Sequence, residues 1–125
     1  MSTAALEYLA NLFQSIGIPY EFVRWYSEEL PDPYFVGEYI ETPSMTKEEN
    51  GFQESTFILR GYTRGTWLGL EQAKEKIEQN VPKTAILPNG NGLVVFYESA
   101  SIVPTYDADL KSIKINLTIQ EWKVK

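Results

Sequence analysis

The stretch KSIKINLTIQEWKV, from Lys111 to Val124, alternates apolar and polar side chains more regularly than any other part of the chain. Ile113, Ile115, Leu117 and Ile119 fall on one face, and polar residues separate them. This alternation predicts a half-buried β-strand. Because a usual strand has roughly 5 to 6 residues, we expect part of this longer strand to project beyond a compact domain and to pair with a partner, such as a second copy of the chain.

The N-terminal third of the chain predicts a helix followed by two strands. Ser2 or Thr3 can cap a helix that ends at Gly17, because apolar residues recur between them at spacings of three and four. Extended segments then run from Tyr20 to Tyr26 and from Tyr34 to Glu41, separated by a turn rich in proline and acidic residues. We interpret these two segments as a hairpin with a long loop.

The middle of the chain predicts a third strand and a second helix. Strand character returns from Ser55 to Arg64. Thr66 then caps a helix that continues to about Asn80. Its spacing predicts an inner face made of Trp67, Leu70, Ala73 and Ile77.

A further hairpin follows this second helix. Strands from Thr84 to Leu87 and from Leu93 to Tyr97 flank the turn Asn89-Gly90-Asn91-Gly92, and Asn-Gly pairs supply the positive φ angles of tight hairpins. A polar link from Glu98 to Asp109 leads to the final strand. The order α-β-β-β-α-β-β-β indicates an α+β fold with two helices and a mixed, mostly antiparallel sheet.

The composition fits one domain that comprises residues 1–125. The chain has 125 residues, 43% of them hydrophobic, which is enough to form a core without staples or metals. The absence of cysteine excludes a disulfide framework and thiolate chemistry, and no N-terminal export signal is recognisable. No apolar run approaches the roughly 18 residues that span a bilayer. We therefore expect a soluble cytosolic protein that does not insert into membranes.

The charge balance argues against binding to nucleic acid. Seventeen acidic and eleven basic residues give a net charge of -6, and the basic residues are scattered rather than gathered in a stripe. Contacts with phosphates supply most of the affinity for nucleic acid. We expect no sequence-specific binding of nucleic acid.

Enzymatic function is not expected either. The chain has no histidine and no cysteine, which excludes Ser-His and Cys-His nucleophiles and removes the usual zinc ligands. Asp107 and Asp109 form a D-x-D pair, but a Mg²⁺ or Ca²⁺ site normally needs more oxygen ligands. Two pairs of adjacent glutamates are interpreted as surface charge rather than as glycosidase carboxylates: Glu28 with Glu29, and Glu48 with Glu49. We predict no catalytic residue, no cofactor and no metal.

The polar segment from Thr42 to Glu54 is the first candidate for contact with a partner. It lacks periodicity, and we predict a mobile surface loop. Loops of this length between strands are usually functional or disordered. Both interpretations stay open: plain disorder, or a segment that becomes ordered against a partner. In the second case Lys47, Glu48 and Glu49 are candidate residues of a subunit interface.

Aromatic residues are the second candidate. The chain has eight tyrosines, six phenylalanines and three tryptophans, many of them between Tyr20 and Tyr39. Most are expected in the core, but rings such as Trp25 and Tyr34 are hard to bury, and exposed aromatic patches mark interfaces. Trp122 falls where the alternation of the final strand breaks. It indicates a bulge, an anchoring ring at an interface, or simple packing against the first helix.

The sequence resembles the tail terminator or tail completion proteins of long-tailed bacteriophages and prophages over nearly its whole length. The resemblance is carried by the short opening helix, the segment GIPYEFVRWYSEELPDPYFVGEY from Gly17 to Tyr39, the polar insertion, the central helix after Arg64, and KINLTIQEW from Lys114 to Trp122. It implies a sheet flanked by helices and a hexameric ring of identical copies without catalysis. That ring would cap the tail tube and join tail to head, so the implied partners are the chain itself, the tail tube protein and head-tail connector proteins.

The resemblance also implies assembly in the host cytoplasm and a final location in the virion tail. Two alternatives stay open beside it. One is a different phage neck or head-tail joining protein. The other is a monomeric module that binds a small ligand or peptide with the aromatic hairpin as a wall.

Overall fold

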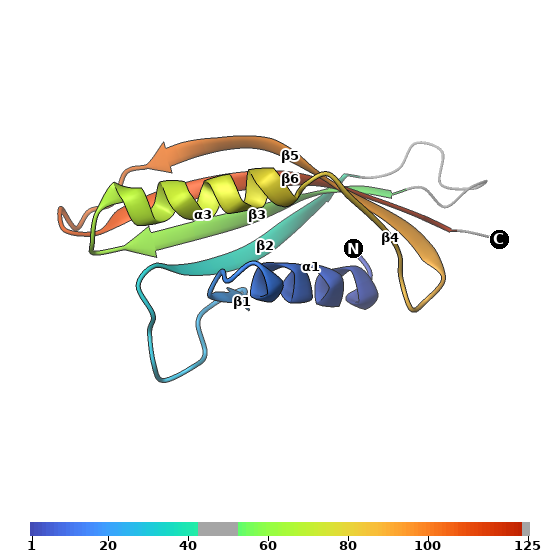
Figure 1. The fold of residues 1–125 in the computed structure, drawn as a ribbon, viewed down its shortest axis with the longest axis horizontal. Helices are drawn as coiled ribbons and strands as arrows, with labels where there is room; N and C mark the ends of the chain where they lie inside the picture. The colour runs from blue at the N-terminus through green and yellow to red at the C-terminus, as the bar shows by residue number, and fades with distance from the viewer. Residues whose placement is uncertain (43–52, 124–125) are drawn as a thin grey trace.

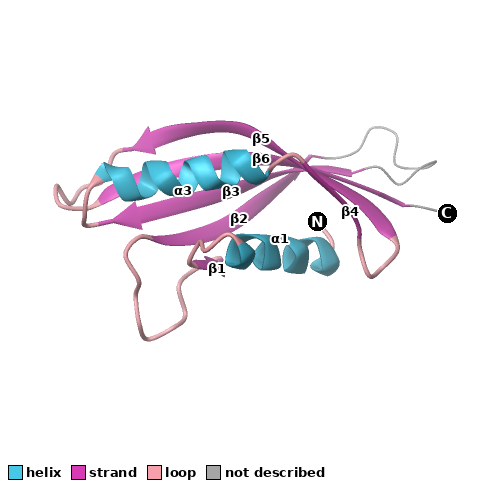
Figure 2. Cartoon of the chain, in the orientation of Figure 1, coloured by secondary structure: helices cyan, strands magenta, loops and turns pink. Residues whose placement is uncertain are grey.

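The described part of the chain folds into a six-stranded sheet with two helices on one of its faces (Figures 1 and 2). The computed structural model describes residues 1–42 and 53–123. The elements are α1 (Thr3–Ser15), β1 (Tyr20–Phe22), β2 (Tyr34–Thr42), β3 (Gln53–Thr63), α3 (Trp67–Asn80), β4 (Lys83–Ile86), β5 (Asn91–Val103) and β6 (Lys111–Lys123). The predicted α+β class, the element order and the mixed, mostly antiparallel sheet are confirmed.

The final strand β6 lies in the middle of the sheet, in the order β1-β2-β3-β6-β5-β4. β3 pairs with it from Lys111 to Glu121, and β5 pairs with it from Ser112 to Lys123. The prediction that this strand projects to meet a partner is therefore wrong. Strands of the same chain pair with both sides of β6, because β3 has 11 residues and β5 has 13.

Strand β5 is much longer than the sequence indicated. A bulge between Tyr97 and Ser99 shifts the register, and the strand then continues to Val103. The predicted polar link from Glu98 is wrong over this stretch. A bulge inserts one residue and so reverses the inward and outward alternation beyond it, which hides the strand from a search for a period of two.

The segment after α1 does not form a hairpin with β2, because β1 and β2 pair in parallel. β1 has three residues and ends at Phe22. The next residue, Val23, has φ 72°, and the N–H of Arg24 donates to the carbonyl of Phe22 at 2.9 Å, which closes a γ-turn. The carboxylate of Glu21 then accepts from the backbone N–H groups of Tyr26 and Ser27. This γ-turn and the carboxylate-held loop carry the chain away from the sheet and return it to begin β2 in the same direction as β1.

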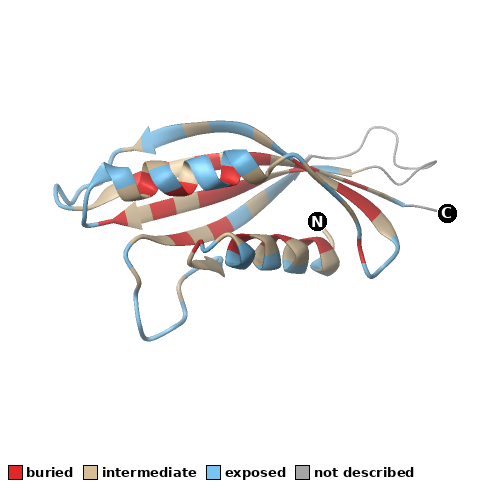
Figure 3. Cartoon of the chain, in the orientation of Figure 1, coloured by how far each residue is buried: buried red, intermediate tan, exposed pale blue. Residues whose placement is uncertain are grey.

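The core lies between the helices and the facing side of the sheet (Figure 3). Alternate residues of β3 and β6 point into it, as the period of two predicts. Ser2 caps α1 by accepting from the N–H of Ala5 at 3.1 Å, as predicted. Leu70, Ala73 and Ile77 of α3 are buried, but the predicted inner residue Trp67 is 36% exposed, since it occupies the first turn of the helix at its end.

Aromatic rings cover glycines on neighbouring strands at three places in the sheet. A Cβ atom added to Gly61 would lie 2.2 Å from the ring of Phe35, which is the residue paired with it on β2. A Cβ on Gly92 would lie 2.4 Å from the ring of Trp122, its partner on β6. Glycine is required at these positions by the close approach of the ring and not by backbone φ.

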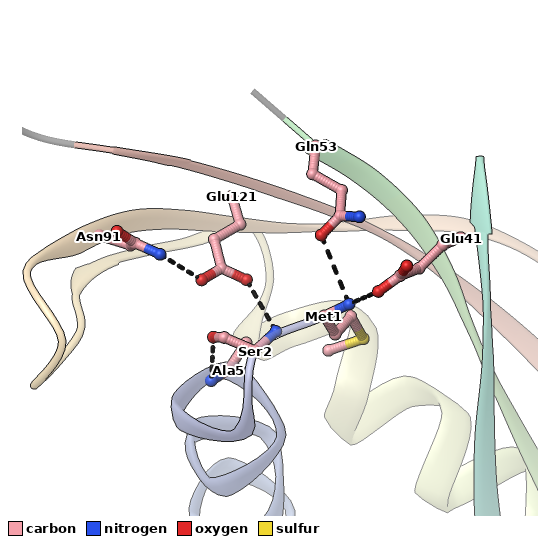
Figure 4. A network of polar contacts seen from close by, with 7 residues as sticks. All are labelled: Met1, Ser2, Ala5, Glu41, Gln53, Asn91 and Glu121. Atoms are coloured by element: carbon pink, nitrogen blue, oxygen red, sulfur yellow. Dashed lines mark hydrogen bonds and ion pairs between the residues drawn. The ribbon is translucent and has the colours of Figure 1, made fainter. Parts of the chain in front are cut away.

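A buried polar network holds the start of α1 against the sheet (Figure 4). Glu121 is buried, and its carboxylate accepts from the N–H of Ser2 at 3.2 Å and from the side-chain amide of Asn91 at 2.7 Å. The amino group of Met1 lies beside Glu41 and Gln53 in the same view. Glu121 therefore joins α1, β5 and β6 through one carboxylate.

Acidification is expected to weaken this network. Burial alone would raise the pKa of Glu121, but the hydrogen bonds from Ser2 and Asn91 outweigh it and the pKa is lowered from 4.5. A lowered pKa in the folded state stabilises the protein above pH 4.5, and this stabilisation is lost as the pH falls through the folded value. Replacement by Gln is expected to cost about 1 to 3 kcal/mol at pH 7 and to flatten this dependence. Chemical unfolding between pH 7 and pH 3 measures both effects.

The exposed glutamate Glu75 on α3 provides the control. Glu75→Gln is expected to leave the free energy of unfolding and its pH dependence unchanged. An unchanged pH dependence in Glu121→Gln would contradict the role of this carboxylate.

Candidate functional site

Three aromatic side chains meet on the open face of the sheet, where β2 begins and β3 ends. The rings of Trp25 and Tyr34 are 5.9 Å apart and meet edge to face, and the rings of Tyr34 and Tyr62 stack at 5.2 Å. Tyr34 and Tyr62 are paired residues on β2 and β3. We call these three residues the aromatic corner. The structure thus brings together two candidate interface residues, Trp25 and Tyr34, and adds Tyr62.

The aromatic corner forms part of the wall of a cavity of about 380 Å³. Leu30 and Val36 add aliphatic surface to this wall, and Arg60 and Glu38 add an ion pair at 3.1 Å. The indole N–H of Trp25 donates to the carbonyl of Glu29 at 2.8 Å, which fixes the ring against the loop between β1 and β2. The cavity therefore combines apolar and polar surface in similar amounts, with aromatic rings beside an ion pair.

All three arginines of the chain surround this corner. Arg24 and Arg60 line the cavity, and the guanidinium of Arg24 lies over the ring of Tyr26 at 4.7 Å. Arg64 is close enough to Tyr34 for the two groups to influence each other electrostatically. Tryptophan, tyrosine and arginine are the residues enriched at the energetic centres of protein interfaces. The composition of the corner therefore favours a protein partner.

The hydroxyl of Tyr34 stays protonated at neutral pH. Burial and the neighbouring Tyr62 raise its pKa, and Arg64 only partly opposes them. Tyr34 therefore presents a neutral donor and acceptor at the rim of the cavity.

Trp122 lies far from the aromatic corner. It is on the open face near the opposite end of β6, over Gly92, while Tyr62 pairs with Ser112 at the near end. At about 3.3 Å per residue, Ser112 and Trp122 are roughly 33 Å apart. The strand has no bulge at Trp122, since its pairing with β5 is regular there, and the ring packs on Gly92 and not on α1. The predicted bulge and the predicted packing against the first helix are therefore wrong, and a role of Trp122 in a subunit interface stays a prediction.

Strand β6 presents polar side chains to the open face between these two ends. Side chains of β6 form hydrogen bonds with neighbouring strands along its length: Asn116 with Ser99 at 3.0 Å, Thr118 with Glu98 at 2.8 Å, and Gln120 with Glu54 at 3.2 Å. Such a face is compatible with water and does not need a covering layer. Apolar side chains also lie on this side of the sheet between its ends, where Ile58 is buried and Ile40 and Phe96 are exposed.

The candidate residues Lys47, Glu48 and Glu49 lie outside the described residues. The predicted loop around them is shorter than expected at both ends. Thr42 belongs to β2, and Gln53 and Glu54 belong to β3 and pair across from β2 or β6. Strand pairing therefore continues into residues that composition alone assigned to the loop.

The acidic residues considered for metal binding have structural partners. Asp107 accepts from Arg64 at 2.8 Å and from the N–H of Asp109 at 2.9 Å, and these bonds lower its pKa. Among residues 1–42 and 53–123, no cluster of three or more acidic side chains is placed to hold a metal ion.

None of the helices in the described part of the chain has the length and apolar character needed to cross a bilayer.

Comparisons with known proteins give matches among solved structures. No family model matches the chain, and no curated protein matches it. Among solved structures, the chain is similar to a component of the virion of a native gene transfer agent particle, with a TM-score of 0.66 and 13% sequence identity. The likeness covers 90% of this chain and 85% of the other. At this level of identity it establishes a shared fold.

Sequence reasoning missed Tyr62, Arg60 and Leu30 as members of the site. Tyr62 and Arg60 both occupy outward positions of β3, so the period of two along that strand contained a signal for their shared face. Leu30 lies in an irregular loop, and no periodicity indicated its place.

Proposed function

We propose that this protein is a structural component of a phage-like particle that assembles with copies of itself. The observation that carries the proposal is the likeness of fold to a component of a gene transfer agent virion, which extends over nearly all of both chains. The sequence supports this proposal, since a chain without histidine or cysteine is better suited to a structural role than to catalysis.

The more specific role that we propose is a tail terminator. In this role a ring of copies caps the tail tube and joins tail to head, as the sequence resemblance implies. The aromatic corner and the exposed apolar side chains at the sheet ends supply surfaces for contacts with subunits and with tube or connector proteins. The net charge of -6 favours free passage of DNA through such a ring, because an acidic surface repels phosphates.

A binding module is the second candidate function. The observation in its favour is the cavity of about 380 Å³ beside Trp25 and Tyr34, which is within the size range of sites for small ligands. In this case the protein works as a monomer and the cavity is the site. The cavity lies on the side of the sheet opposite the helices, so it does not compete with the core for the same side chains.

Mass in solution separates the two functions. Light scattering over a wide range of protein concentration is expected to show an oligomer, or a reversible equilibrium with one, and electron micrographs of concentrated protein are expected to show rings. A strict monomer at every concentration would overturn self-assembly and favour the binding module. Retention of duplex DNA at moderate salt would contradict the proposed acidic passage.

A further inference from the structure

On each side of the sheet, the outermost strand is shorter than the strand it pairs with. β1 covers only residues 35–37 of β2, so residues 38–42 of β2 have no further described strand beside them. On the other side β4 covers only residues 92–95 of β5, and residues 96–103 are likewise bare within the described part of the chain. Figure 1 shows β1 and β4 as the short outermost strands of the two sides.

The strand registers show that the short outer strand on one side of the sheet and the uncovered stretch on the other side are complementary in position. Two rows of paired residues run from β1 to β5: Tyr20, Phe35, Gly61, Ile113 and Ile102 in one, and Phe22, Gly37, Leu59, Ile115 and Ala100 in the other. A row near the opposite end runs from β2 to β4: Glu41, Ser55, Ile119, Val95 and Lys83. Each of these rows crosses five strands. β1 therefore lies level with the uncovered stretch of β5, and the first two residues of β4, Lys83 and Thr84, lie level with Glu41 and Thr42 at the end of the uncovered stretch of β2.

The bare edges carry exposed apolar side chains. Each of the four edge segments has at least one exposed large hydrophobic residue: Phe22 on β1, Ile40 on β2, Ile86 on β4, and Phe96 and Ile102 on β5. Proteins normally protect free edges with lysine, proline or a covering element. Residues 96–103 contain no lysine, arginine or proline, although the bulge at Tyr97 gives partial protection. These edges have the properties of pairing surfaces.

Space for an added strand exists beside β1. A groove of about 910 Å³ runs between α1 and residues 20–27, and its lining includes Leu6, Ala10, Phe22 and Val23. β1 pairs with β2 through groups that include the N–H of Val23 and the carbonyl of Pro19. The backbone groups of Tyr20 and the N–H of Phe22 then point the other way, because these groups alternate along a strand, while the carbonyl of Phe22 already accepts from the N–H of Arg24. An edge strand beside a helix is a common place for a further strand to bind.

We propose that β5 of one copy pairs with β1 of a second copy, with Ala100 and Ile102 opposite Phe22 and Tyr20. β1 and β5 run in opposite directions in the sheet, so the joint is antiparallel. In the same joint, Lys83 and Thr84 of β4 in the first copy lie beside Glu41 and Thr42 at the end of β2 in the second. β1 of the second copy and β4 of the first copy then lie one after the other along the same strand position, between β5 of the first copy and β2 of the second.

This joint uses different surfaces on the two copies, so it is heterologous and repeats from copy to copy until a ring closes. The inference rests on the proposed self-assembly and specifies how it occurs. It also explains why the outer strands on the two sides of the sheet cover different stretches of their neighbours.

A matched pair of substitutions tests the joint. Ile102 on β5 and Leu68 on α3 are 64% and 61% exposed, so aspartate at either position is tolerated by the fold to a similar degree. Ile102→Asp is expected to weaken assembly about tenfold or more, as the loss of a central interface residue does, and Leu68→Asp is expected to leave it unchanged. Equal assembly of the two variants, with both folded by circular dichroism, would overturn the joint.

Cross-linking identifies the neighbours directly, because the natural chain has no cysteine. The double variant Phe22→Cys, Ala100→Cys is expected to form disulfide-linked ladders of copies under mild oxidation, and each single variant is not. The control pair Phe22→Cys, Ile86→Cys is expected to form none, since these residues lie at different levels. An assembled protein without ladders, or with ladders in the control, rejects the joint alone. A protein that stays monomeric at all concentrations rejects the proposed self-assembly as well.

Discussion

Replacement of Leu117 by aspartate is expected to abolish folding. Leu117 is fully buried in the central strand β6, between Phe57 of β3 and Tyr97 of β5. The variant loses the burial of a leucine side chain, worth roughly 1.5 to 3 kcal/mol, and places an unpaired carboxylate in the core at a cost of several kcal/mol more. The sum is comparable with the total stability of a typical domain, about 5 to 15 kcal/mol. Circular dichroism and cooperative thermal unfolding measure the result.

A neighbouring position on the same strand provides the control. Lys114 lies on the open face, where it pairs across from Arg60 and Ser101. Lys114→Asp introduces the same aspartate side chain at a partly exposed position that pairs with Arg60. This variant is expected to fold with a nearly unchanged midpoint of thermal unfolding. A cooperative transition in Leu117→Asp near that of the natural protein would show that this side of β6 does not face the core.

The second large effect is expected from Gly61→Ala. The new Cβ would lie 2.2 Å from a carbon of the Phe35 ring, which is itself fully buried and cannot move into solvent. Overpacking of this kind typically costs about 1 to 3 kcal/mol, and the confined ring places this site at the upper end. Denaturant unfolding of the variant measures the loss.

A smaller side chain at the facing position is expected to restore part of the loss. Phe35→Leu removes the atoms that clash, so the double variant Gly61→Ala, Phe35→Leu should lose less stability than the sum of the two single changes. Gly65→Ala is the control, because a Cβ there meets only the hydroxyl of Thr63 at 3.4 Å. Strict additivity of the two changes would contradict direct contact between this glycine and ring.

The helices and one hairpin were predictable from the sequence because local chemistry decides them. Ser2 caps α1 as predicted, and the apolar spacing of α3 gives its buried residues Leu70 and Ile77. The turn between β4 and β5 follows from the Asn89-Gly90 pair, since Gly90 has φ 88°. These features depend on residues that are neighbours in the chain.

The sheet order was not predictable in the same way. The alternation of β6 indicates which side chains are buried, but it does not indicate which strands lie beside it. The parallel pairing of β1 depends on the carboxylate of Glu21, which holds the backbone of Tyr26 and Ser27 several residues further along the chain. The extent of β5 depends on its bulge. Neither feature leaves a periodic pattern in the sequence.

The candidate interface was predictable in part. The density of aromatic residues identified Trp25 and Tyr34, and the structure places their rings in contact. The sequence did not indicate that Tyr62, Arg60 and Arg64 join them, because these residues come from β3 and the loop that follows it. Trp122 was also identified by its type, but it lies at the other end of the sheet.

The central place of β6 has a consequence for synthesis on the ribosome. It alone links the β1-β2-β3 half of the sheet to the β5-β4 half, and its pairing with β3 joins residues as distant in the chain as Gln53 and Glu121. Until this strand emerges, β3 and β5 each keep a long unpaired flank, which makes the nascent chain slow to mature and prone to aggregate. Translation products that stop before Lys111 should therefore be insoluble rather than merely less stable.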